Sequence, residues 1–109
     1  MLNAFTVDVE DYFQVSAFEK VVRRNDWGRY ELRVAGNTRR LLELLDRGGV
    51  RATFFVLGWT ARACPELVRE IHACGHEIGC HGYWHRLIYD QSPEQFREDL
   101  RLARDVLAD

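Results

Sequence analysis

The fold of this chain is decided by residues 50–85, which read VRATFFVLGWTARACPELVREIHACGHEIGCHGYWH. The stretch opens with an apolar run, Val50–Leu57, that is typical of a strand buried on both faces. A helical segment over Glu66–Ala73 follows, and a short strand over His76–Cys80 then leads into His81–His85. A strand, a helix and a strand in this order predict parallel strands joined by a right-handed crossover.

The same alternation extends to both sides of this stretch. Residues Leu2–Val9 form another apolar, β-favouring run, which ends in acidic residues. After a long aromatic and charged excursion, Asn37–Thr38 offers an N-cap for a leucine-rich helix that stops at Gly48–Gly49. Ser92 then opens a final helix over Glu94–Leu107. The pattern therefore predicts an α/β fold with parallel strands and crossover helices.

Three parallel strands are few for an independent α/β domain, because a closed barrel or a doubly wound sheet needs more strands to hide both edges. The sequence thus predicts a single unit over residues 1–109 that forms the front part of a larger fold.

Composition limits the classes of function. The 109 residues are 47% hydrophobic, which supports an ordered core. Fifteen basic and seventeen acidic residues give a net charge of -2 without a basic stripe, which argues against a nucleic-acid partner. No apolar run is long enough to span a bilayer, and the start does not resemble a signal peptide, so we expect a cytoplasmic protein.

Two polar clusters follow predicted strands. Asp8, Glu10 and Asp11 follow the first strand, and His81 and His85 follow the third. Parallel strands present their carboxyl ends at one edge of a sheet, so carboxylate and imidazole groups can meet there with coordination positions left open. Two histidines with a carboxylate suit Zn, Co or Ni better than Mg or Ca. The sequence therefore predicts a catalytic divalent-metal site.

Other interpretations of these residues are more ordinary. The histidines could merely end a strand, and the acids could form a solvated turn. Acids left unpaired at an apolar edge are costly without a cation, which favours the metal site. Gly82 indicates that the histidines lie on a loop rather than a helix. Tyr83 and Trp84 lie between the histidines and are candidates for stacking on sugar rings, although such aromatics commonly serve ordinary packing.

The residues just described resemble a known family. Ala52–Gly58 (ATFFVLG), Pro65–Val68 and Gly75–His85 (GHEIGCHGYWH) are similar to the polysaccharide deacetylases, also called carbohydrate esterase family four or the chitooligosaccharide deacetylase homology domain. The resemblance implies the N-terminal part of a distorted (β/α) barrel. It also implies a metal-dependent hydrolase that removes acetyl groups from polysaccharides.

The family's motifs imply roles for individual residues. The first motif is usually T-F-D-D-G, with the first acid as general base and the second as metal ligand, and this chain has TVDVED over residues 6–11. Asp8 matches the base, whereas Val9 stands where the metal-binding acid is expected. The ligand is therefore Glu10 or Asp11, and Glu10 is favoured because it shares a strand face with Asp8. The second motif, H-[ST]-x-x-H, implies that His81 and His85 are metal ligands.

The stretch DVEDYFQV over residues 8–15 is similar to a bacterial subgroup found with exopolysaccharide and exosortase gene clusters. This similarity implies an N-acetylated exopolysaccharide substrate on the cytoplasmic side. The family's R-x-P-x-G, D-x-x-D-W and L-x-H segments are not found in these residues, which predicts a catalytic domain truncated at its C-terminus and doubtful activity of the chain alone. An amidase of small nitrogenous substrates and an inactive half-barrel fragment remain as alternatives.

Overall fold

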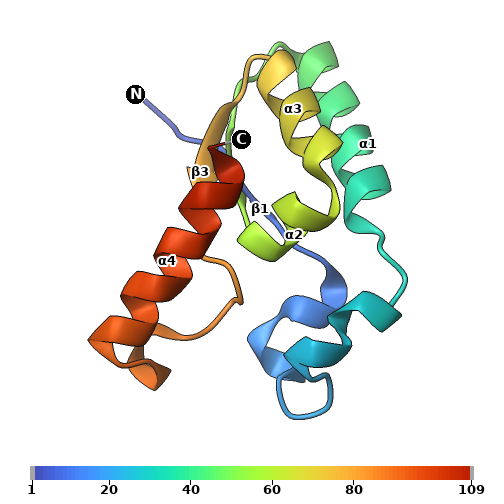
Figure 1. Cartoon of the computed structure of the whole chain (residues 1–109). Coiled ribbons are helices and arrows are strands. Elements are labelled where there is room, and N and C mark those ends of the chain that lie inside the picture. The colour runs from blue at the N-terminus through green and yellow to red at the C-terminus, as the bar shows by residue number, and fades with distance from the viewer. Residues whose placement is uncertain (1, 109) are drawn as a thin grey trace.

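A three-stranded parallel sheet organises the chain (Figure 1). The computed structural model describes residues 2–108. The strands are β1 (Thr6–Val9), β2 (Thr53–Val56) and β3 (Glu77–Cys80), and they lie in the order β1-β2-β3. This arrangement confirms the predicted parallel α/β fold. All three strands are shorter than predicted, because pairing with a neighbouring strand begins only at Thr6, Thr53 and Glu77.

Helices follow each strand. The long helices are α1 (Val34–Gly48), α3 (Pro65–Ala73) and α4 (Pro93–Leu107), and the short α2 (Gly58–Ala63) precedes α3. The N-terminus of α4 is the predicted one, because Ser92 and Gln95 cap it reciprocally at 3.1 and 2.9 Å.

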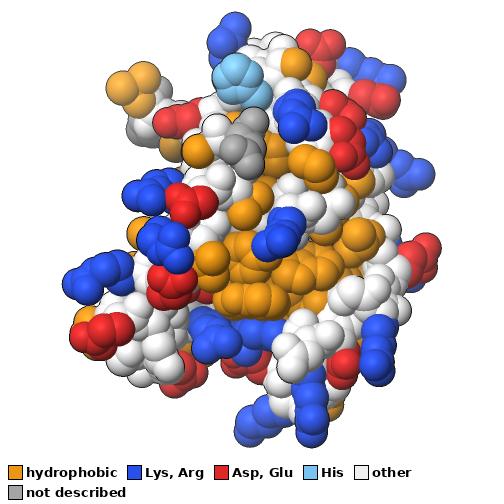
Figure 2. Space-filling view, viewed as in Figure 1, with side chains coloured by type: hydrophobic (Ala, Val, Ile, Leu, Met, Phe, Trp, Pro, Cys, Tyr) orange, Lys and Arg blue, Asp and Glu red, His pale blue; other side chains and the backbone are white. Residues whose placement is uncertain are grey.

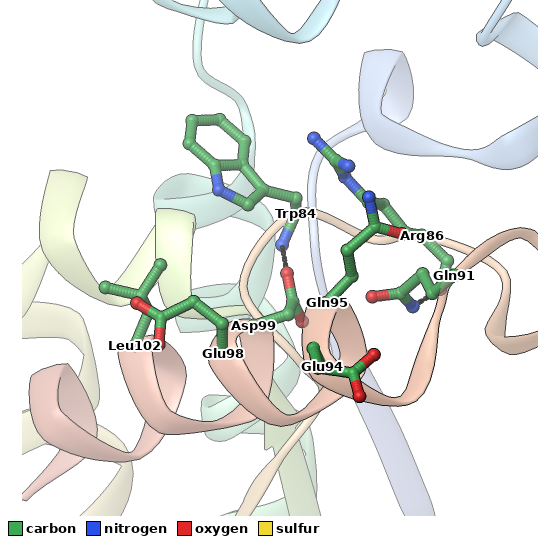
Figure 3. A pocket seen from close by; sticks show the side chains of 8 residues that line it. All are labelled: Trp84, Arg86, Gln91, Glu94, Gln95, Glu98, Asp99 and Leu102. Atoms are coloured by element: carbon green, nitrogen blue, oxygen red, sulfur yellow. Dashed lines mark hydrogen bonds between the residues drawn. The ribbon is translucent and has the colours of Figure 1, made fainter.

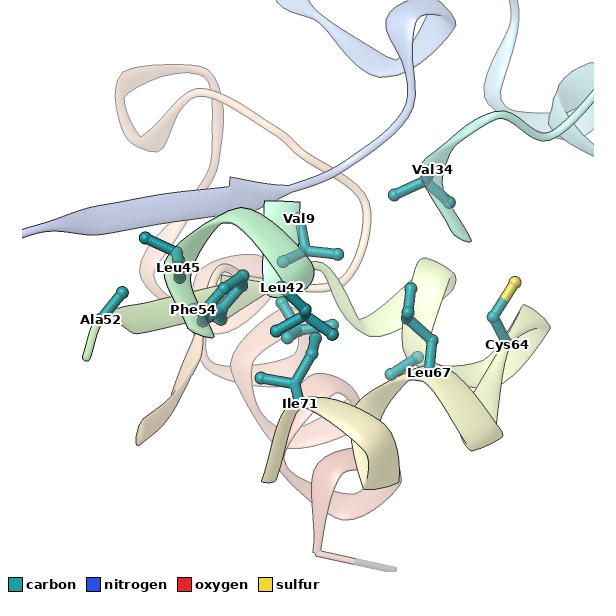
Figure 4. Packing of buried hydrophobic residues seen from close by; sticks show 11 residues of the cluster. Val9, Val34, Leu42, Leu45, Ala52, Phe54, Cys64, Leu67 and Ile71 are labelled. Atoms are coloured by element: carbon teal, nitrogen blue, oxygen red, sulfur yellow. The ribbon is translucent and has the colours of Figure 1, made fainter. Parts of the chain in front are cut away.

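The core lies between one face of the sheet and helices α1 and α3 (Figure 4). Phe54 and Val56 of β2 are fully buried there, whereas Phe55 points to the other face and is only half-buried. The predicted burial of this strand on both faces is therefore wrong, since no described helix covers the second face. The residues that meet in the core are Val9, Leu42, Leu45, Phe54, Val56, Leu67 and Ile71.

Helix α1 begins three residues before the predicted N-cap at Asn37–Thr38. Its first N–H groups are satisfied by a distant side chain, because the Asp11 carboxylate accepts hydrogen bonds from the backbone of Arg33 at 2.8 Å and of Val34 at 3.0 Å. Such a cap replaces the local one that the sequence pattern suggested.

The aromatic excursion between β1 and α1 forms three short 3-10 helices, η1 (Tyr12–Gln14), η2 (Ser16–Phe18) and η3 (Arg24–Arg29). Phe13 and Trp27 of this excursion are buried against Leu57, and Trp84 packs on the same cluster. The excursion is thereby attached to the carboxyl end of the sheet.

Helices α2 and α4 pack closely against each other. A methyl group added at Gly58 would lie 2.9 Å from the backbone of Ala103 and 2.6 Å from the ring of Tyr83. Hydrophobic side chains gather over this region, between α4 and the excursion (Figure 2).

Among residues 2–108, no helix combines the length and the apolar character needed to cross a membrane.

Candidate metal centre

The two polar clusters meet at the carboxyl edge of the sheet. Glu10 follows the last residue of β1, and His81 follows the last residue of β3. The backbone N–H of His81 donates to the carbonyl of Val56 at 3.1 Å, which extends the pairing of β2 and β3 by one step. The hydrogen bond at the end of the β2–β3 pairing therefore fixes the backbone position of His81.

The second histidine reaches the site through a tight loop over residues 81–85. Gly82 has φ +75° and His85 has φ +54°, so both lie in the left-handed region and no helix forms. The turn brings the ring of His85 back to within 5.1 Å of the ring of His81. The structure confirms the predicted loop.

Glu10, His81 and His85 form a compact group of ligand atoms. Oε2 of Glu10 lies 2.8 Å from Nε2 of His85 and 3.2 Å from Nε2 of His81. One ligand atom of each residue lies within 4.8 Å of the other two, and all three residues are half-buried. The group joins side chains that are far apart in the sequence.

The residues of this group fit a divalent cation. Oε2 of Glu10 and Nε2 of His81 are buried without a hydrogen-bond partner in the described structure, although buried polar atoms are normally paired. The ligand atoms of the three residues lie within 4.8 Å of one another, close enough to share one ion. A carboxylate and two imidazoles form a donor set that suits Zn, Co or Ni.

The electrostatics prepare the carboxylate for a cation. Burial alone would raise the pKa of Glu10, but the adjacent His81 and His85 outweigh it and lower the pKa from 4.5 to about 2. Contact with Glu10 raises the pKa of His85 despite the opposing effect of burial. Glu10 is therefore ionised at neutral pH, and a metal ion would compete with a proton for His85.

Asp8 lies beside the group rather than within it. Its Oδ2 is 3.7 Å from Nε2 of His81, and its side chain is 58% exposed. The carboxylate is therefore free to face a reacting water. This position suits the base that the family motif implies for Asp8.

Asp11 is not brought to the group. Its side chain is 3% exposed and accepts backbone hydrogen bonds from Tyr12, Arg33 and Val34. All of these contacts serve the starts of η1 and α1. The geometry therefore favours Glu10 over Asp11 as the carboxylate ligand.

Tyr83 and Trp84 lie in the interior side of the loop. Tyr83 is 6% exposed and packs beside Gly58, which leaves little ring surface for a sugar. Trp84 is half-buried, with its ring centroid 5.8 Å from that of Trp27. Packing accounts for the position of Tyr83, whereas Trp84 also lines a hollow of about 350 Å³ beside α4, so sugar stacking on Trp84 stays a prediction.

Hollows flank the group on two sides. One, of about 310 Å³, is lined by Asp8, Glu10 and Arg33. The other, of about 500 Å³, is lined by both histidines together with apolar residues that include Ile88 and Tyr89. The ligand atoms therefore lie next to space that a substrate could enter.

Two residues that hold the loop were not identified from the sequence. Asp99 of α4 accepts hydrogen bonds from the backbone of residues 83 and 84, and Arg24 of η3 donates to the carbonyls of residues 84 and 85. No local motif marks either residue, because each acts across a long separation in sequence.

Comparison with known proteins places this arrangement in a family. The model of the family described as polysaccharide deacetylase matches residues 26–109. The chain belongs to the polysaccharide deacetylase family. The matched residues include both histidines, whereas Asp8 and Glu10 lie outside the match and reach the site through the sheet.

Individual members of the polysaccharide deacetylase family resemble the chain over part of their length. A peptidoglycan-N-acetylglucosamine deacetylase of Bacillus cereus is 33% identical over 70 residues, 64% of this chain and 26% of the relative. A chitin deacetylase of Colletotrichum lindemuthianum is 43% identical over 53 residues, 44% of this chain and 21% of the relative. This chain thus spans about a quarter of the length of these curated relatives.

A solved structure confirms the fold. A protein of Mycobacterium smegmatis, provisionally named a polysaccharide deacetylase, superposes with a TM-score of 0.70 at 34% identity, over 95% of this chain and 37% of that chain. The parallel sheet and its helices therefore match part of the deacetylase barrel, as the sequence predicted.

Proposed function

We propose that this chain carries the metal-binding part of a deacetylase that hydrolyses the N-acetyl groups of a polysaccharide. The observation that carries the proposal is the convergence of Glu10, His81 and His85, with two buried ligand atoms that have no hydrogen-bond partner among residues 2–108. Membership in the polysaccharide deacetylase family supports the reaction class.

Each residue has a role in this proposal. Glu10, His81 and His85 would hold the divalent ion, with Zn as the first candidate and Co or Ni as others. Such an ion supplies polarisation of the acetyl carbonyl and a lowered pKa for a nucleophilic water. Asp8 accepts the proton of that water at its exposed carboxylate.

Within the polysaccharides, we propose an N-acetylated bacterial exopolysaccharide as the substrate and the cytoplasm as the location. The support is the similarity of residues 8–15 to the subgroup found with exopolysaccharide gene clusters. The relatives named above act, by their names, on peptidoglycan and chitin, so these two polymers are the natural comparison substrates. Cell fractionation tests the location.

Acetate release tests the function. The chain is incubated with zinc and with purified exopolysaccharide, peptidoglycan or N-acetylglucosamine oligomers, and the double variant His81→Ala with His85→Ala serves as the control. Acetate release by the wild-type chain but not by the variant would support the proposed function. Zinc binding without acetate release would reject deacetylation by this chain alone, and absence of zinc binding would reject the metal site.

The same assay separates the proposal from an amidase of small nitrogenous substrates. Ammonia or small-amide turnover without acetate release from any polysaccharide would favour that alternative. No observation on the described residues favours that alternative.

A further inference from the structure

The loop that carries the two histidines is held by its backbone rather than by its side chains. Two backbone N–H groups of α2 donate to carbonyls of the loop. The N–H of Gly58 donates to the carbonyl of Gly82 at 2.7 Å, and the N–H of Trp59 donates to the carbonyl of Tyr83 at 3.3 Å. These contacts fix the first half of the loop. They leave the amides of residues 83 and 84 and the carbonyls of residues 84 and 85 to be satisfied by other groups.

Asp99 satisfies the two amides. Its Oδ2 accepts from the backbone of Tyr83 at 2.9 Å and its Oδ1 accepts from the backbone of Trp84 at 3.0 Å (Figure 3 shows the second bond). The side chain belongs to α4 and is only 8% exposed. A buried carboxylate that accepts one backbone N–H on each oxygen makes charge-assisted hydrogen bonds, which are stronger than neutral ones.

Arg24 satisfies the two carbonyls from the opposite side. Its Nε donates to the carbonyl of Trp84 at 2.7 Å and its Nη2 donates to that of His85 at 3.1 Å. Glu19 pairs with the same guanidinium and helps to orient it. A planar guanidinium can serve two carbonyls at once, which an ammonium group cannot do with the same geometry.

The loop needs such support at His85. Among residues 2–108 it is the one non-glycine residue with a positive φ, at +54°. This conformation is sparsely populated for residues with a side chain, and it persists where surrounding contacts impose it. It also turns the imidazole toward Glu10, so a relaxed backbone would move Nε2 away from the ligand group.

We infer that Asp99 and Arg24 are positioning residues that hold the 81–85 loop from two sides and thereby set the geometry of the two histidine ligands. Among the hydrogen bonds and ion pairs of residues 2–108, neither side chain has one to the ligand atoms. The inference rests on the proposed metal site, and it deepens that proposal by assigning the loop conformation to one carboxylate and one guanidinium.

The test compares matched variants of the whole chain. Asp99→Asn replaces one accepting oxygen with a donor, and Asp105→Asn on the exposed side of α4 is its control. Arg24→Lys keeps the charge but loses the planar donor pair, and Arg23→Lys at an exposed position is its control. The readouts are Zn²⁺ affinity by calorimetry and the visible absorption spectrum of the Co²⁺-loaded chain, which reports ligand geometry.

We expect Asp99→Asn and Arg24→Lys each to weaken Zn²⁺ binding by about 10–100-fold, the range typical of groups that orient metal ligands. The Co²⁺ spectrum should change in both variants, whereas the two controls should retain the affinity and the spectrum of the wild type. Unchanged affinity and spectrum in Asp99→Asn and Arg24→Lys would overturn the inference while leaving the metal site in place. If Asp99→Asn fails to fold, Arg24→Lys carries the comparison, because its side chain lies nearer the surface.

Amide hydrogen exchange of the metal-free chain decides the inference if the wild type binds no zinc. Asp99→Asn should then accelerate exchange at residues 83 and 84 by at least about tenfold, with helix α3 unchanged as an internal reference. Equal exchange in Asp99→Asn and Asp105→Asn would show that the carboxylate does not hold the loop.

Discussion

The carboxylate of Asp11 accepts a hydrogen bond from the backbone N–H of Val34 at 3.0 Å, across 23 positions of the chain. The same oxygen accepts from Arg33 at 2.8 Å, so one side chain starts helix α1. Asp11 is adjacent to Glu10 in the sequence, yet the two acids have different roles. Asp11 caps helix α1, and Glu10 contacts His81 and His85.

This division predicts opposite effects for neighbouring substitutions. Asp11→Ala should lower the free energy of unfolding by about 1–2 kcal/mol, because the first N–H groups of α1 lose their cap. Zn²⁺ affinity at a temperature where the variant is folded should change by less than about threefold, since no ligand is removed. Thermal unfolding and calorimetry measure the two quantities, with the exposed Glu31→Ala as control. A stable Asp11→Ala chain without zinc binding would instead identify Asp11 as a ligand.

The ligand group itself predicts a loss of metal binding on substitution. Alanine substitution of Glu10, His81 or His85 removes one of three donors, so each should weaken Zn²⁺ binding by more than about 100-fold, beyond the range of groups that only orient ligands. His72→Ala is the matched control, because His72 is exposed on α3. An equal loss of affinity in the His72 variant would contradict the assignment.

Substitution of Asp8 should affect acetate release without affecting Zn²⁺ affinity. Asp8→Asn keeps the side-chain volume and leaves the three ligands in place, so Zn²⁺ affinity should stay within about threefold of the wild type. Acetate release should fall by about 100-fold or more, the usual contribution of a general base. Loss of zinc binding in this variant would make Asp8 a fourth ligand rather than the base.

The sequence was sufficient for those features that depend on local patterns. Periodicity and capping residues predicted α3 and α4 within one residue of their observed starts, and the histidines were placed on a loop because of Gly82. The acidic cluster after β1 was correctly placed at the same edge of the sheet as the histidines, because the carboxyl ends of parallel strands lie at one edge.

Features that depend on distant partners could not be predicted in the same way. The start of α1 depends on Asp11, and the loop conformation depends on Asp99 and Arg24, none of which shares a local motif with the groups it binds. The strand-face argument already favoured Glu10 over Asp11 as the ligand, whereas the role of Asp11 as the cap of α1 appears only in three dimensions. Tyr83 was expected to face a substrate, but the packing at Gly58 turns it inward.

The contact of α2 with α4 predicts a strong effect at a single glycine. Gly58→Ala would place a methyl group 2.9 Å from the backbone of Ala103, which cannot move without shifting α4. We expect a loss of about 1–3 kcal/mol in the free energy of unfolding, the usual cost of overpacking. Gly36→Ala in α1 is the control, since nothing lies within 4 Å of the added methyl group there, and it should stabilise the chain by about 0.5–1 kcal/mol. Equal stability of the two variants would contradict the close approach of the helices.

The pair of Glu10 and His85 predicts a stability maximum in mild acid for the metal-free chain. The pKa of Glu10 is lowered from 4.5 to about 2, so its contribution is complete above pH 4.5 and is lost as the pH falls toward 2. The pKa of His85 is raised above 6.5, so its contribution is complete below pH 6.5 and is lost as the pH rises through the folded-state value. Both contributions coincide between pH 4.5 and 6.5.

Thermal unfolding in the presence of a chelator measures this dependence. The stability difference between wild type and Glu10→Gln should be largest in that window and should reach no more than about 3 kcal/mol, because the two shifts describe one interaction and are counted once. Added zinc should reverse the trend above the window, since metal binding requires an ionised Glu10 and a neutral His85 and therefore strengthens as the pH rises. A zinc-free maximum above pH 6.5, or a zinc effect that weakens from mild acid to neutral pH, would show that these two side chains do not share one site.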